Sequence, residues 1–237
     1  MLHRGAINTK AVLKWVEDHY KTPEKILVTG FSAGAYASAY WLPHIRESYP
    51  NSSVTQFGDS GISPITEDFA KVAFENWKAK KEAPVWVPGL DPDQVDWNKL
   101  QIAYIYEKLM SYYPGVQFGH YTTAFDSTQR GFYWLMYGKA EEWPVIVKNT
   151  LHTLAKSPKF RYFSSEGSEH GVLSFSRFYE VKSTDDFKFQ DWFKSYIAGE
   201  MVKNHDCVNC VDEEKELWLE PRQKESTEEI EEAKLDF

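Results

Sequence analysis

The five residues Gly30-Phe31-Ser32-Ala33-Gly34 restrict the possible folds of this chain more than any other segment. They match the Gly-x-Ser-x-Gly pattern of a sharp strand-to-helix turn, where glycine lets the backbone approach closely. Residues 25–29 predict a buried strand before the turn, and residues 35–49 predict a helix after it. The segment therefore predicts an α/β fold in which Ser32 projects from the carboxyl end of a sheet. A small-residue turn that only packs a helix against a strand is the alternative, since the pattern is common by chance.

A serine at such a turn is typical of acyl transfer, and the first N–H groups of the helix, including that of Ala33, would face the oxyanion. The serine also needs a histidine that accepts its proton and an acid that orients the histidine. In α/β-hydrolases the order along the chain is serine, acid, histidine. His170 is the predicted base because it lies in a polar loop, residues 165–171, after a predicted late strand. A solvated loop histidine without a catalytic role is the alternative, and His120 and His152 are weaker candidates.

Asp126 is the predicted acid because it follows a predicted strand at residues 115–123. Asp59 is the alternative acid, just after the predicted strand at residues 54–57, although an aspartate after a strand is often only a turn or helix cap. The Gly58-Asp59-Ser60-Gly61 segment also imitates the nucleophile segment of trypsin-like proteases. Those proteases are all-β and carry histidine and aspartate ahead of the serine, so this second resemblance is misleading.

Four segments in order resemble the motifs of the pectin acetylesterase family of α/β-hydrolases, which includes the Notum lipid deacylases: residues 30–35, 58–61, 123–129 and His170. The resemblance implies a triad of Ser32, Asp126 and His170. It also implies a secreted or periplasmic esterase that removes acetyl or longer acyl groups from a polysaccharide or another alcohol. The chain departs from the family pattern at Ala35, where a second glycine is common, and at Phe125, where tyrosine is common.

The family's glycine-rich, tryptophan-containing upstream stretch has no match in this chain. Only one predicted helix, residues 8–19, and one predicted strand precede Ser32, whereas an α/β-hydrolase places several strands before its serine. We therefore expect a chain that lacks the first strands and the second oxyanion donor. A minimal hydrolase with a rebuilt sheet and a different hydrolase topology are the alternatives. A catalytically silent fragment that binds a glycan or a partner is the competing function.

We expect residues 1–211 to form the hydrolase domain and residues 212–237 an acidic tail that is a solvated helix or disordered. Residues 62–114 predict a two-helix insertion, which either covers the active site as a lid or packs in the core. Aromatic rings can stack on a sugar face or line an acyl pocket. The predicted substrate contacts are Phe31, Trp86 and Tyr121.

The formal net charge of −8 argues against a nucleic-acid partner. No apolar run is long enough to span a bilayer, and no secretory signal is recognisable at the start. Cys207 and Cys210, with His205 nearby, lack the second pair that a structural zinc site needs, so a local disulfide or two free thiols is predicted. We predict neither metal nor cofactor, and the sequence does not indicate an oligomeric state.

Overall fold

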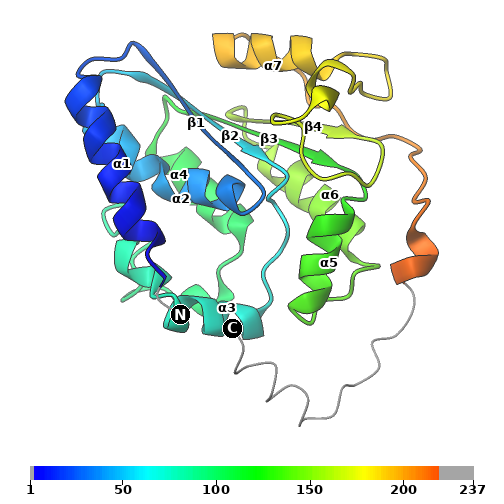
Figure 1. Cartoon of the computed structure of the whole chain (residues 1–237), viewed down its shortest axis with the longest axis horizontal. Coiled ribbons are helices and arrows are strands. Elements are labelled where there is room, and N and C mark those ends of the chain that lie inside the picture. The colour runs from blue at the N-terminus through cyan, green and yellow to red at the C-terminus, as the bar shows by residue number, and fades with distance from the viewer. Residues whose placement is uncertain (1–2, 219–237) are drawn as a thin grey trace.

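The computed structural model describes residues 3–218. These residues form a four-stranded sheet in which every strand runs parallel to its neighbours, in the order β1-β2-β3-β4 (Figure 1). The strands are β1 (Lys25–Phe31), β2 (Ser53–Asp59), β3 (Gln117–Thr123) and β4 (Phe160–Ser165). Each predicted strand is present, and the mostly parallel sheet with helices confirms the predicted α/β class. The predicted acidic tail lies outside the described residues from position 219 onward.

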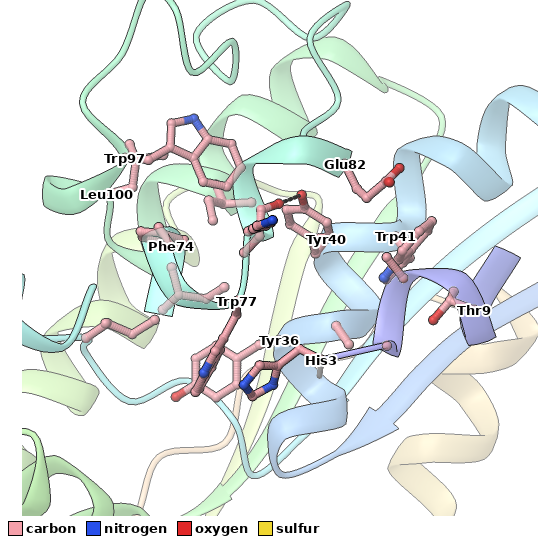
Figure 2. Close-up of a pocket in the computed structure, with 18 of the residues that line it drawn as sticks. His3, Thr9, Tyr36, Tyr40, Trp41, Phe74, Trp77, Glu82, Trp97 and Leu100 are labelled. Carbon is pink, nitrogen blue, oxygen red and sulfur yellow. Dashed lines mark hydrogen bonds between the residues drawn. The ribbon is translucent and has the colours of Figure 1, made fainter. Parts of the chain in front are cut away.

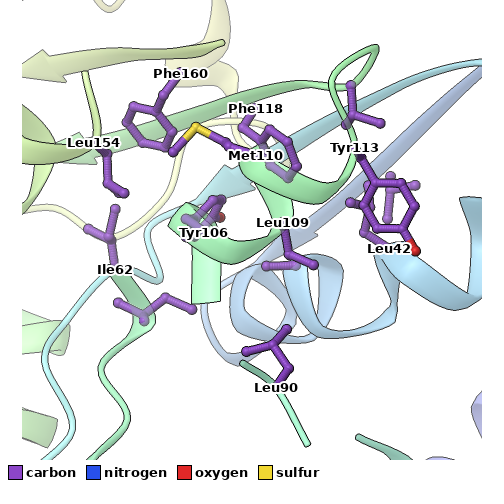
Figure 3. Packing of buried hydrophobic residues seen from close by; sticks show 14 of the residues in the cluster. Leu42, Ile62, Leu90, Tyr106, Leu109, Met110, Tyr113, Phe118, Leu154 and Phe160 are labelled. Carbon is purple, nitrogen blue, oxygen red and sulfur yellow. The ribbon is translucent and has the colours of Figure 1, made fainter. Parts of the chain in front are cut away.

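Helices cover both faces of the sheet, because parallel strands need crossover connections. The helices are α1 (Gly5–His19), α2 (Ala33–Ser48), α3 (Glu67–Asn76), α4 (Ile102–Tyr112), α5 (Ser127–Leu135), α6 (Trp143–Leu154) and α7 (Phe189–Ala198). One core cluster packs α2, α4 and α6 against the sheet, as Figure 3 shows for Tyr106, Leu109, Phe118 and Phe160. A second, aromatic cluster packs α7 on the opposite face.

The register of the sheet aligns the carboxyl ends of all four strands in one row. Phe31 pairs with Asp59, Asp59 with Tyr121, and Tyr121 with Phe163. The turns that carry Ser32, Ser60, Asp126 and His170 follow these ends. Among the described strands β1 pairs only with β2, so the strand that carries the serine turn lies at the edge of the described sheet.

The two predicted helices of residues 62–114 have different surroundings. α4 forms part of the crossover from β2 to β3 and buries Tyr106, Leu109 and Met110 in the main core. α3, which Thr66 caps through its side chain, lies farther from the sheet and buries only Ala70 and Ala73. The segment therefore contains one core helix and one peripheral helix.

Candidate active site

Ser32 lies at the turn between β1 and α2 with φ 57° and ψ −122°, a conformation that residues other than glycine rarely adopt. Gly30 makes the turn possible, because a Cβ there would lie 2.0 Å from the carbonyl oxygen of Gly34. A Cβ on Gly61 would lie 2.3 Å from the carbonyl oxygen of Ser32. Gly34 has no such restriction, since nothing lies within 4 Å of its Cβ position. Gly30 and Gly61 thus leave the space that the turn at Ser32 occupies.

Among the described residues, hydrogen bonds occupy the backbone N–H groups of Ser32 and Ala35, but not that of Ala33 between them. The Ser32 N–H donates to the carbonyl of Asp59 at 2.8 Å, and the Ala35 N–H donates to the carbonyl of Ser32 at 2.9 Å. Ala33 is the first residue of α2, so its N–H has no acceptor within the helix. Ala33 and Ser32 line the same cavity. This N–H therefore suits a negatively charged oxygen beside Ser32.

His170 and Asp126 form a directly hydrogen-bonded pair. Nδ1 of His170 lies 2.8 Å from Oδ2 and 3.0 Å from Oδ1 of Asp126, whose side chain is fully buried. Because a carboxylate only accepts, the proton of this bond belongs on Nδ1. Nε2 of His170 is buried and has no hydrogen-bond partner among the described residues. The imidazole is thus held in the tautomer whose free nitrogen can take a proton.

Ser32, Ala33 and His170 line part of the wall of a cavity of about 390 Å³. Its other walls are mainly apolar and come from α3 and its surroundings and from α5: Ile65, Phe69, Ala73, Phe74, Trp77, Phe132 and Met136. No hydrogen bond joins the Ser32 hydroxyl to Nε2 of His170 among the described residues. In ligand-free enzymes such bonds are often long and tighten only with substrate.

A second cavity of about 630 Å³ adjoins the first, and the two share Tyr36, Phe74 and Trp77 in their walls (Figure 2). α2 contributes Tyr40, whose hydroxyl donates to the carbonyl of Ala79 at 2.5 Å. The start of α1, with His3, forms another side of it. The space beside Ser32 therefore continues into a larger aromatic-lined volume.

Asp59, the alternative acid, makes no hydrogen bond to His170 among the described residues. Its fully buried carboxylate accepts the backbone N–H groups of Val172 at 3.0 Å and Leu173 at 2.8 Å. Burial raises the pKa of Asp59, and these two N–H groups partly oppose that rise. The Ser60 hydroxyl binds the same stretch of backbone, because it accepts the N–H of Gly171 at 3.0 Å. Asp59 and Ser60 thus fix the backbone just after His170.

Gln129, the last residue of the segment 123–129, and His120, a weaker candidate for the base, have roles in the site that the sequence did not predict. The Gln129 amide donates to Asp126 Oδ2 at 2.9 Å and accepts the Ile62 N–H at 3.0 Å, linking the acid to the turn after β2. Nε2 of His120 accepts the Gly61 N–H at 3.2 Å. Burial lowers the pKa of His120 to about 3, so it stays neutral. The spacing of Gln129, three residues after the helix cap Asp126, is the signal that could have revealed it.

The three predicted substrate contacts lie in different places. The ring centroid of Phe31 lies 4.9 Å from that of His170, and Phe31 is not on the cavity wall. Trp86 donates to the hydroxyl of Tyr113 at 3.0 Å and is not on the cavity wall. Tyr121 is fully buried, with its hydroxyl 2.8 Å from Oγ of Ser165. Of the three, Phe31 alone packs its side chain against His170.

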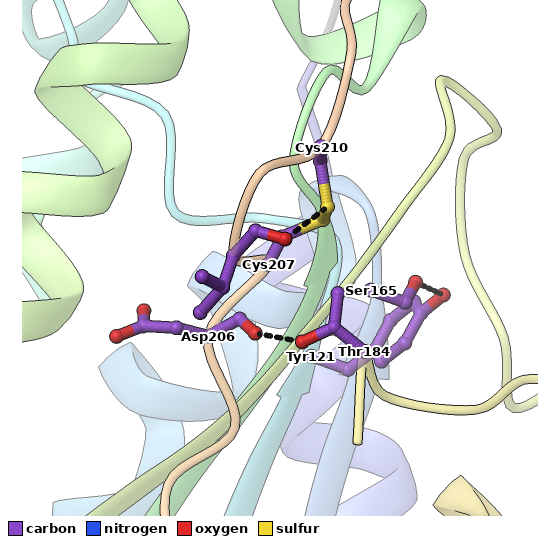
Figure 4. Close-up of a disulfide and its surroundings, with 7 residues drawn as sticks. Tyr121, Ser165, Thr184, Asp206, Cys207 and Cys210 are labelled. Atoms are coloured by element: carbon purple, nitrogen blue, oxygen red, sulfur yellow. Dashed lines mark hydrogen bonds between the residues drawn. A yellow bond between two sulfur atoms is a disulfide. The ribbon is translucent and has the colours of Figure 1, made fainter. Parts of the chain in front are cut away.

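Cys207 and Cys210 are joined in a disulfide, one of the two predicted states (Figure 4). Nearby His205 is buried, and its Nδ1 lies 3.0 Å from Oδ1 of Asp185. Residues 3–218 contain no group of three or more histidine, cysteine, aspartate or glutamate side chains that could hold a metal ion. No helix in the same range is long and apolar enough to cross a membrane.

No family model and no curated protein sequence matches this chain. Among solved structures it is similar to the Wnt deacylase Notum from Drosophila. In crystal form I the TM-score is 0.58 at 16% identity, covering 88% of this chain and 67% of the Notum chain. In crystal form II the TM-score is 0.60 at 15% identity, covering 87% and 63%. The chain thus spans about two thirds of the length of these structures, and at such identities the likeness establishes a shared fold.

Proposed function

We propose that this chain is a serine carboxylic-ester hydrolase in which Ser32 is the nucleophile, His170 the general base and Asp126 the residue that orients the imidazole. The observation that carries this proposal is the shared cavity. Ser32, in its strained turn, lines that cavity together with His170, whose Nδ1 is bonded to Asp126 and whose Nε2 is unpaired. The likeness to a deacylase fold and the ordered motifs support membership of the pectin acetylesterase and Notum family.

The reaction follows from these positions. The Ser32 oxygen attacks the ester carbonyl while Nε2 of His170 takes its proton. The N–H of Ala33 stabilises the negative oxygen of the tetrahedral intermediate. The intermediate collapses, the ester C–O bond breaks, and His170 returns the proton to the leaving alkoxide. Water then hydrolyses the acyl-serine by the same steps. Asp126 keeps the proton on Nδ1 and stabilises the imidazolium.

The cavity walls support an apolar acyl group as the part of the substrate that enters beside Ser32. The alcohol part would remain outside, as an acylated carbohydrate or another small ester. α3, which supplies much of the wall, would then be the lid-like part of residues 62–114. The disulfide and the family resemblance support an oxidising location, secreted or periplasmic.

Ser32→Ala tests this proposal. It should lower turnover of short-chain aryl esters by on the order of 10⁴-fold, because the reaction loses its nucleophile. The free energy of unfolding should change little, since the Ser32 hydroxyl makes no hydrogen bond among the described residues. The measurement is steady-state kinetics beside urea unfolding of both proteins. Equal turnover in the two proteins would contradict the proposal, and a wild type with no turnover above the uncatalysed rate would favour a silent glycan- or partner-binding module.

A further inference from the structure

The last described segment, residues 212–218, crosses the two loops that carry Asp126 and His170; we name it the C-terminal strap. Its Glu214 carboxylate accepts hydrogen bonds from two serine hydroxyls. Oε2 accepts from Ser127, and Oε1 accepts from Ser168 at 2.8 Å. Ser127 directly follows Asp126, and Ser168 lies two residues before His170. One carboxylate therefore bridges the acid loop and the histidine loop.

The two loops also touch directly at this point, because the Ser127 N–H donates to the carbonyl of Ser168 at 2.8 Å. The Ser127 hydroxyl is the main cause that lowers the pKa of Glu214 below its usual range. The carboxylate is thus ionised at neutral pH and only accepts, which suits two hydroxyl donors. The bridge adds to the loop contact rather than replacing it.

Arg130, on α5, anchors the strap. Its side chain is fully buried, and Nη1 lies 3.0 Å from the carboxylate of Asp212. Nε donates to the carbonyl of Ala140 at 3.3 Å, and the guanidinium lies 4.9 Å from the ring centroid of Trp218. A buried guanidinium is costly without charged partners, and removing the strap would leave it only the Ala140 carbonyl among the described residues. Arg130 therefore holds the strap on both sides of Glu214, at Asp212 and at Trp218.

We propose that Glu214 is a positioning residue that fixes the distance and angle between His170 and Asp126. This inference rests on the proposed function. The strap does not line the cavity that holds Ser32, so Glu214 acts on the triad and not on the bound acyl group. A misplacement of about 1 Å from a distant change can cost 10²-fold in rate.

The experiment compares Glu214→Ala with Glu213→Ala, which removes the same charge from the exposed neighbouring position. With short-chain aryl esters, Glu214→Ala should lower kcat by roughly 10- to 100-fold and leave KM unchanged. Glu213→Ala should match the wild type. Glu214→Gln, which keeps one oxygen acceptor, should restore part of kcat. A rise in KM alone, or equal kcat in the two alanine variants, would overturn the proposal.

A second readout does not depend on turnover. The Nδ1 proton of His170, bonded to Asp126, should give a downfield NMR resonance. Glu214→Ala should shift or broaden this resonance, while Glu213→Ala should not. If Glu214→Ala does not fold, Ser168→Ala removes one donor of the bridge and should show the same change. An unchanged resonance in the folded variant would overturn the inference. A wild type without Ser32-dependent turnover would defeat the proposed function, while this resonance would still test the strap.

Discussion

Two buried aspartates lie near His170, and their hydrogen-bond partners give them different tasks. Asp126 binds the imidazole itself through Nδ1, whereas Asp59 binds the backbone N–H groups of Val172 and Leu173. The first contact orients the ring, and the second fixes the chain that carries it. Asp126 thus contacts the proposed base directly, whereas Asp59 only holds the backbone of the loop that carries it.

Replacing each aspartate by asparagine separates these tasks. Asp126→Asn should lower kcat by on the order of 10⁴-fold, because its amide no longer stabilises the required tautomer. Asp59→Asn should lower the free energy of unfolding by about 1–3 kcal/mol, because an amide NH₂ then opposes a backbone N–H. Its effect on kcat should be much smaller. Kinetics and urea unfolding of both variants measure this, and reversed kinetics would make Asp59 the acid.

His120 predicts a pH dependence of stability. Its pKa is about 3 in the folded protein against 6.5 as its ordinary value, so the unfolded chain binds more protons between these values. Stability from the neutral imidazole is therefore complete above about pH 6.5 and is lost as the pH falls toward 3, with a slope of up to about 1.4 kcal/mol per pH unit. His120→Gln, which can still accept the Gly61 N–H, should remove that slope. The test is urea unfolding of both proteins from pH 7 to pH 4, where equal slopes would contradict the role.

At the scale of elements, the turn between β1 and α2 depends on one of its two motif glycines. Gly30→Ala would place a Cβ 2.0 Å from a backbone oxygen that cannot move away cheaply, so it should lower the free energy of unfolding by roughly 3 kcal/mol. Gly34→Ala is the matched control, since its Cβ meets nothing and alanine favours the helix by about 0.5–1 kcal/mol. Urea unfolding measures both variants. Equal losses at the two positions would show that the close approach at Gly30 does not govern the turn.

The strands were predictable because each depends on a local pattern of residues in the sequence. Apolar runs bounded by turn residues predicted all four strands, and the order of motifs brought Asp126 and His170 into consideration. The roles of α3 and α4 were not predictable, because a helix that packs on a sheet and a helix that covers a cavity show the same apolar spacing. The task of Asp59 depends on the backbone of residues 172–173, more than one hundred positions later. Trp86 and Tyr121 suggested binding by type alone, and their location depends on the packing of the whole sheet.

At the scale of the whole molecule, the parallel register collects the proposed chemistry at one edge of the sheet. Four turns from distant parts of the chain meet there because the four strands end in one row. The C-terminal strap then crosses two of these turns through Glu214. The proposed site is therefore a product of topology, with short-range motifs at Ser32 and Asp126 supplying the side chains.

Covalent labelling with a fluorophosphonate probe tests the central claim most directly, because the probe reacts with a serine only when a neighbouring base activates it. The folded wild type should be labelled, and mass spectrometry of its peptides should find the adduct on Ser32. Ser32→Ala and heat-unfolded wild type serve as controls and should remain unlabelled. Absence of labelling in the folded wild type, or an adduct on another serine that persists in Ser32→Ala, would contradict the account.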